Sequence, residues 1–253
     1  MTVKLSGDRP LIGPVSLDGR NGKGRTTGLV LLALALLAAW LWPASEQSDR
    51  PSSLSRTELV GPRGPACVRV VVGLDISGSM TLFAKPRDAA LEQLLTWVRQ
   101  PRTLRDNDEV AVVEFAFDAG VRQSATAVTA LPAPLQATHV SDGADTLLEP
   151  LLTATSALSP TRCDVALVLI SDAQLADLPI SPVVGRDRLN RHGVHDLRLL
   201  APGRSIDVPG QWATGFPEAA PTRFDGANAE ETALAFGRTI ADLTHQTLRR
   251  RTI

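Results

Sequence analysis

The hydrophobic and polar positions of the chain change pattern near residue 66. From there onward, short segments that are apolar at nearly every position alternate with segments whose apolar residues recur every three or four positions. Continuously apolar segments are typical of strands buried on both faces, and the second pattern is typical of helices with one buried face. The predicted strands, in chain order, are 68–76, 109–117, 121–128, 164–171, 196–200 and 222–224.

Helical segments lie between these strands. The clearest spans 86–100, where four apolar residues follow helical spacing. The others are predicted at 147–158, 177–191 and 229–249. The last of them is preceded by Asn228, a residue type typical of helix N-caps, and its C-terminal end is basic, which suits the helix dipole.

This alternation predicts an α/β fold with a doubly wound, mostly parallel sheet covered by helices on both faces. A turn at 118–120 joins the second and third strands, which therefore form a hairpin and give the sheet an antiparallel edge strand. Ligands of such sheets bind beyond the carboxyl ends of the strands. We therefore look for function at the residues that follow each strand.

The N-terminal part of the chain has a different pattern. Residues 28–43 read GLVLLALALLAAWLWP, an uncharged apolar run between polar flanks. A helix of about fifteen residues spans roughly 22 Å, less than the ~30 Å hydrocarbon core, but the tryptophans suit the membrane interface. We predict a transmembrane anchor. The apolar region of a cleaved signal peptide and a buried core helix are the alternatives.

Lysines and arginines before the apolar run outnumber acidic residues, whereas the charges after it roughly cancel. This bias predicts a single-pass protein of the cell membrane with a cytoplasmic N-terminus and a folded domain outside the cytoplasm. The predicted organisation is a cytoplasmic tail at 1–27, the anchor at 28–43, a linker at 44–65 and one domain at 66–253.

Composition narrows the classes of function. The 253 residues are 43% hydrophobic and 21% charged, with a formal net charge of −1. Such a chain is globular and has no strong field of either sign, and we expect no nucleic-acid binding.

Oxygen-bearing side chains follow two of the predicted strands, and another lies in a loop between these strands. Asp75, Ser77 and Ser79 follow the first strand, Thr146 opens the second helix, and Asp172 follows the fourth strand. Hard oxygen donors of this kind suit Mg²⁺, or Mn²⁺ or Ca²⁺, rather than zinc. A single Asp or Thr at such a place is more often a helix cap, so the prediction depends on the three elements occurring together.

The segments VVVGLDISGSM, TLLEPLL and LVLISD together resemble the von Willebrand factor A (VWA) domain family, in a bacterial-type membrane-anchored form. The resemblance covers about 66–250 and implies a doubly wound α/β fold with a metal-ion-dependent adhesion site. The metal ligands that it implies are Asp75, Ser77, Ser79, Thr146 and Asp172.

Two positions depart from the pattern of the family. Ala173 stands where a glycine usually follows the acidic residue of the third loop. Asp145 precedes Thr146 where glycine is common, so the second loop has an alternative register.

The resemblance also bears on the two cysteines. In a VWA fold the first and fourth strands are neighbours, and Cys67 and Cys163 open them at nearly the same level. This implies a disulfide between the two, with two buried thiols as the alternative.

The resemblance implies a binding module and not an enzyme, in which the metal takes an acidic side chain from a protein partner. Two alternatives remain. One is a structural subunit of a membrane complex with a degenerate metal site, and Ala173 favours this alternative. The other is a Mg²⁺-dependent phosphohydrolase, but Ser77 stands where haloacid-dehalogenase-like enzymes need a second aspartate, and the chain has no Walker-type phosphate loop.

Overall fold

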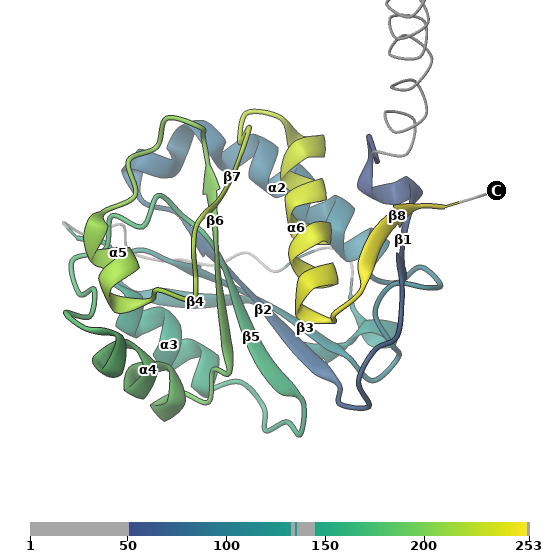
Figure 1. Cartoon of the computed structure of the whole chain (residues 1–253), viewed down its shortest axis with the longest axis horizontal. Helices are drawn as coiled ribbons and strands as arrows, with labels where there is room; N and C mark the ends of the chain where they lie inside the picture. Colours follow the sequence, from purple (N-terminus) through teal and green to yellow (C-terminus); the bar gives the residue numbers. More distant parts are fainter. Residues whose placement is uncertain (1–50, 133–134, 136–144, 252–253) are drawn as a thin grey trace, which may run out of the picture. The chain divides into compact units, whose positions relative to one another are not determined.

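The computed structural model of the chain describes residues 51–132, 135 and 145–251 (Figure 1). They fall in the second of the two compact units into which the chain divides, 1–48 and 49–253. The predicted tail (1–27) and anchor (28–43) lie outside the described residues. Within the described part, no helix is both long and apolar enough to cross a membrane.

A six-stranded sheet forms the centre of the described unit, with strand order β4-β3-β2-β5-β6-β7. All neighbouring strands are parallel except β3 and β4, so the predicted parallel sheet with one antiparallel edge strand is confirmed. The strands are β2 (Val68–Asp75), β3 (Glu109–Phe115), β4 (Ala119–Ala127), β5 (Asp164–Ile170), β6 (Asp196–Pro202) and β7 (Thr222–Phe224).

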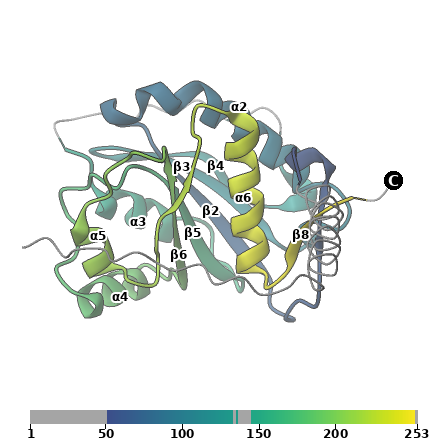
Figure 2. The same ribbon diagram turned by 45° about the horizontal axis from the view of Figure 1, so that its top comes forward.

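Helices cover both faces of this sheet (Figure 2). On one face, α2 (Ala84–Trp97) and α6 (Ala229–Leu243) pack against alternate residues of the strands, among them Val70 and Val72. On the other face, α3 (Leu148–Ser156) packs together with α4 (Pro182–Arg191) and α5 (Gly210–Gly215).

The central strand β2 is buried along its whole length, as its continuous apolar sequence predicts. Gly73 lies under α3, and a Cβ atom there would come within 2.9 Å of a Leu151 methyl group. A larger residue there would have to displace the Leu151 methyl groups, so glycine lets α3 pack close to β2.

A second, two-stranded sheet was not predicted. β1 (Thr57–Val60) pairs antiparallel with β8 (Thr247–Arg250). The segment 57–60 was predicted to be linker, and just before it the short 3-10 helix η2 (Leu54–Arg56) buries Leu54 completely. The folded unit therefore includes residues that the sequence placed before the domain.

The last helix is also shorter than predicted. α6 ends at Leu243 and not at residue 249, because the chain reverses at His245, which has a positive φ of 56°. The Gln246 N–H then donates to the Ala241 carbonyl, as at the end of many helices. The basic residues that follow lie in β8 and do not extend the helix.

Candidate functional site

The first loop of the predicted site begins at Asp75, the last residue of β2, which is fully buried. The Ser77 N–H donates to Asp75 Oδ1 at 2.9 Å. The chain then enters the 3-10 helix η3 (Gly78–Phe83), which brings Ser77 Oγ within 3.1 Å of Ser79 Oγ. Ser77 is buried and Ser79 is exposed. The two residues of the first loop therefore lie between the buried end of β2 and the solvent.

The third loop meets the first at the end of β5. Ser171 Oγ donates to Asp75 Oδ2 at 2.6 Å and accepts from the Ala173 N–H at 2.8 Å. Asp172 is buried, and its Oδ1 accepts from the Gln174 N–H. Ser171 was not singled out from the sequence, although the pairing of Leu74 with Ile170 in the sheet places it directly beside Asp75.

The second loop is held at the same edge by backbone hydrogen bonds. The Leu147 N–H donates to Ala116, just past β3, and the Ala176 N–H donates to the Thr146 carbonyl. Thr146 therefore lies between the loops that follow β3 and β5. The two possible registers of the second loop make either Thr146 or Asp145 the candidate ligand. Thr146 is buried and Asp145 is exposed.

Asp177 joins the second and third loops. Its carboxylate accepts from the N–H groups of Leu148 and Glu149 at 2.7 and 2.9 Å, so it caps the N-terminus of α3. Arg188 of α4 donates to the Asp177 carbonyl. The segment that carries Thr146 is thus fixed by a residue of the loop that carries Asp172.

The electrostatics of this edge disfavour a charged Asp75. Burial raises the pKa of Asp75 above its ordinary value of 3.8, and the negative charge of Asp172 raises it further. Hydrogen bonds from Ser171 and Ser77 lower the pKa but do not outweigh burial. The carboxylates of Asp75 and Asp172 are therefore both largely removed from solvent and repel each other. A cation between them would offset the cost of desolvation and the repulsion.

These residues fit a small, hard divalent cation. The site offers two carboxylates and three hydroxyls, all oxygen donors, from three loops. Asp75 uses one lone pair of each oxygen in the hydrogen bonds described, which leaves acceptor capacity on both. Within the described part of the chain, no group of three or more His, Cys, Asp and Glu side chains could hold a metal ion, so a cation at this edge would depend on the hydroxyls as well as on the two carboxylates.

Arg87 supports the first loop from within α2. Arg87 is 4% exposed, and its Nη1 donates to the Asp75 carbonyl at 2.8 Å while Nε and Nη2 contact Asp88. The sequence held a signal for this role that was missed. Arg87 lies four residues before Leu91 and so occupies the buried stripe of the helix.

Ala173 adopts an unusual backbone conformation directly after the acidic residue of the third loop. Its φ is +59°, in the left-handed region, and its side chain is fully buried. The left-handed conformation is strained for alanine and free of strain for glycine. The departure from the VWA pattern noted in the sequence therefore falls where the backbone favours glycine.

The disulfide between Cys67 and Cys163 lies at the opposite edge of the sheet, where β2 and β5 begin. The two Cα atoms are 4.7 Å apart. The pairing implied by the resemblance is thus confirmed. It leaves the carboxyl edge of the sheet, where the site lies, without cysteines.

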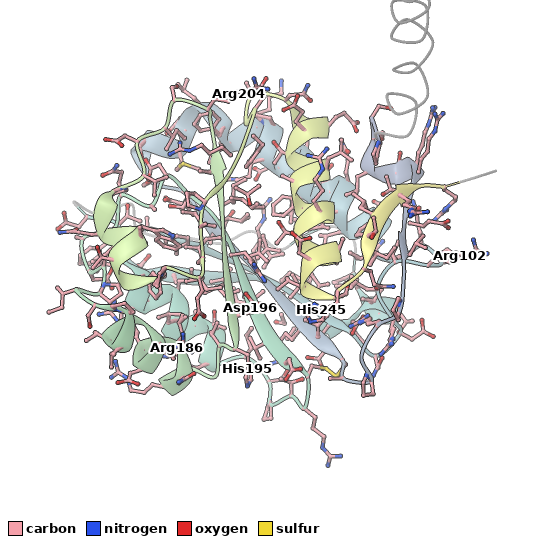
Figure 3. The ribbon with its side chains drawn as sticks, viewed as in Figure 1. Arg102, Arg186, His195, Asp196, Arg204 and His245 are labelled. Carbon is pink, nitrogen blue, oxygen red and sulfur yellow. A yellow bond between two sulfur atoms is a disulfide. The ribbon has the colours of Figure 1, made fainter. Side chains whose placement is uncertain are left out.

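A pocket of about 340 Å³ lies between α4, α5 and the start of β6, where Figure 3 labels Arg186, His195 and Asp196. Its basic residues already have acidic partners, since Arg186 pairs with Glu218 and Arg198 with Asp196. The pocket therefore presents paired charges and is separate from the site described above.

No family model matches the chain, and no curated protein has significant sequence similarity to it. Among solved structures, the similar ones include a von Willebrand factor type A protein from Catenulispora acidiphila (14% identity, TM-score 0.47, 76% of this chain and 51% of that one). A second is the conserved hypothetical protein BatB from Bacteroides thetaiotaomicron (16% identity, TM-score 0.45, 70% and 99%).

A third is proximal thread matrix protein 1 from the mussel byssus (11% identity, TM-score 0.49). The matched region is 74% of this chain and 49% of the mussel protein, so the chain spans about half the length of that structure. The resemblance to VWA domains found in the sequence is thus found among solved structures as well. At these identities and TM-scores it carries no information about ligand or partner.

Proposed function

We propose that this chain is a membrane-anchored VWA-type domain that binds a protein partner through a divalent cation, Mg²⁺ or alternatively Mn²⁺ or Ca²⁺. The proposed metal ligands are the carboxylates and hydroxyls at the carboxyl edge of the sheet, namely Asp75, Ser77, Ser79, Thr146 and Asp172. The partner contributes an acidic side chain. Residues 28–43 hold the chain in the membrane, with the N-terminus in the cytoplasm and the domain outside it.

The observation that carries this proposal is the buried carboxylate pair formed by Asp75 and Asp172. Burial and the neighbouring charge raise the pKa of Asp75, so a free carboxylate is unfavourable there without a counter-ion. A divalent cation would supply that counter-ion. Held in part by neutral hydroxyls, it would keep an affinity for a further anionic ligand.

Exposed apolar side chains at the same edge support a protein as the partner. Leu82, in η3 just after the first loop, is 85% exposed, and Phe117, in the turn after β3, is 49% exposed. Exposed apolar side chains that lie close together often mark protein–protein interaction sites. A partner that presents an Asp or Glu among apolar residues would fit this edge.

Calorimetric titration of the full chain in detergent with Mg²⁺, Mn²⁺ and Ca²⁺ tests the metal site. We expect one site per chain, lost in Asp75→Ala and in Asp172→Ala. Asp187→Ala is the matched control, because it removes an exposed carboxylate from α4, away from this edge. If the wild type binds none of the three ions, the cation mechanism is wrong and a structural subunit with a degenerate site becomes the better proposal.

Affinity capture from membranes, with and without EDTA, tests the partner. We expect capture of a protein that is lost with EDTA and in Asp75→Ala, and weakened about tenfold or more by Leu82→Ala with Phe117→Ser, as for central interface residues. Val60→Ala removes an exposed apolar side chain in β1, outside the three loops of the site, and is expected to leave capture unchanged. Capture insensitive to EDTA and to Asp75→Ala would contradict metal-mediated binding.

A further inference from the structure

Five arginines gather around the two-stranded sheet β1–β8, on the opposite side of α6 from the parallel strands' carboxyl-edge loops. We call them the arginine cluster: Arg56, Arg102, Arg249, Arg250 and Arg251. Figure 3 labels Arg102 in this region, beside β1 and β8 as placed in Figure 1. Nothing in the proposed metal site uses them.

Backbone pairing brings the members of the cluster together. Arg250 lies opposite Thr57 in the ladder and Arg249 opposite Glu58. The Arg251 N–H donates to the Arg56 carbonyl, and the Leu59 N–H donates to the Arg102 carbonyl. Residues far apart in the sequence are thus brought together around this small sheet, with Arg249 and Arg250 on its opposite faces.

Few acidic groups offset this surface. Arg102 is 75% exposed and pairs with Glu58 at 3.3 Å. Arg56, Arg249 and Arg250 are exposed, and no ion pair joins any of them to another described residue. Five arginines against Glu58 leave the cluster with a net charge of about +4.

The rest of the unit has the opposite charge. Residues 51–253 contain 20 Lys and Arg and 23 Asp and Glu, a net charge of −3. Without the arginine cluster and Glu58, the remainder carries about −7. An anionic surface would therefore attract this unit at the cluster and repel it elsewhere.

An anchor at 28–43 would limit how far the cluster can move from the membrane, because the chain between them is short. The apolar run ends at residue 43, and Leu54 is already buried in the folded unit. About ten residues separate them, which reach at most about 35 Å when fully extended. Arg56 follows Leu54 by two residues, so an anchor at 28–43 would tether the unit on this side.

From the charge of the cluster and its place next to the chain's entry, we infer that the arginine cluster docks onto the headgroups of anionic phospholipids. The inference rests on the anchor of the proposed function. Docking would hold β1–β8 against the membrane and leave the other faces of the unit directed away from it.

Arginine-specific labelling of the full wild-type chain tests this docking. The chain is placed in lipid nanodiscs of phosphatidylcholine alone or with one quarter phosphatidylglycerol, treated with phenylglyoxal, and analysed residue by residue by mass spectrometry. We expect labelling of Arg56, Arg249 and Arg250 to slow about fivefold or more in the anionic discs, since each basic residue at such a surface adds roughly a fivefold preference. High salt should abolish the difference.

Matched controls are present in the same chain. Arg162, Arg191 and Arg204 are exposed on other parts of the described unit and should be labelled equally in both kinds of disc. Equal labelling of the cluster in both discs would overturn the docking. The same protection by a 20-base-pair DNA duplex added to phosphatidylcholine discs would assign the cluster to nucleic acid and also overturn it.

Flotation separates failure of the docking from failure of the anchor. A chain that floats with pure phosphatidylcholine vesicles is anchored, and the labelling result then decides the docking alone. If the chain does not float with phosphatidylcholine vesicles, the anchor is wrong. The docking is then tested by flotation with phosphatidylglycerol vesicles. Loss of that flotation in R56Q/R249Q/R250Q, with retention in R162Q/R191Q/R204Q, would support docking, and flotation with neither lipid would overturn it.

Discussion

Asp75 is the residue at which stability and the proposed function oppose each other. Because its folded pKa is raised above 3.8, the folded state holds a proton in a pH interval where the unfolded state has released it. Without metal, the free energy of unfolding therefore falls as pH rises through that interval. A bound cation would reverse this loss, because it favours the charged carboxylate.

Asp75→Asn separates the two effects. The amide keeps an acceptor for the Ser77 N–H and a donor toward Ser171, but carries no charge. We expect its metal-free melting temperature at pH 7 to exceed that of the wild type, measured by scanning calorimetry. Saturating Mg²⁺ should stabilise the wild type by about 2.7 kcal/mol at one hundred times the dissociation constant, and the variant not at all. A less stable metal-free variant would contradict this account of the site.

Ala173 offers a second test at the residue scale. Ala173→Gly relieves a left-handed backbone at a cost of some unfolded-state entropy, so we expect a net stabilisation of about 0.5–1 kcal/mol in urea denaturation. Ala154→Gly, within α3, is the control and should cost about 1 kcal/mol. Destabilisation by both changes would mean that the buried methyl group of Ala173 outweighs the strain.

At the scale of elements, β1 and β8 extend the unit beyond the boundary that the sequence indicated. Each is four residues long, and their pairing joins positions about 190 residues apart. The segment 247–250 continues the polar pattern of a helix end, so periodicity alone does not reveal its pairing with β1.

Leu54→Ala tests whether this extension is part of the cooperative core. Leu54 is fully buried and contacts α6, where a Cβ on Gly237 would come within 2.4 Å of its Cδ1. We expect a loss of about 2–5 kcal/mol in the free energy of unfolding. Leu82→Ala, at an 85% exposed leucine, should change it by less than about 0.5 kcal/mol. Equal, small effects would show that 54–60 folds independently of the core.

The long apolar strands were predictable because burial on both faces leaves a continuous hydrophobic signal, as in β2 and β5. The positions of Asp75 and Asp172 followed from those strand ends. Ser171 and Arg87 were missed because their roles depend on contacts across the sheet and beneath the loop. The place of Arg87 on the buried stripe of α2 could have been read from the sequence. Its partner, and that of Ser171, could not.

For the whole molecule, the disulfide is the longest-range covalent constraint among the described residues. Cys67 and Cys163 are separated by 96 residues. Replacing both by serine should lower the free energy of unfolding by about 4–5 kcal/mol, because the unfolded chain regains the entropy of a long open loop. Urea denaturation of the variant and of the reduced wild type should agree. A loss below about 1 kcal/mol in both would mean that the unfolded chain stays compact without the bond.

Asp108 adds polar interactions close to the Cys67–Cys163 disulfide. Its buried carboxylate accepts two hydrogen bonds from Arg63 at 2.6 Å and one from the Val68 N–H. A pull arriving from the N-terminal side of the chain therefore meets β1, Arg63 and the disulfide in turn before it reaches the site. Since the disulfide ties β2 to β5, tension would load two central strands along their length, and their ladder bonds would have to shear together. With the proposed anchor and ligand in place, such a load would cross the sheet in shear and would not peel its strands apart one by one.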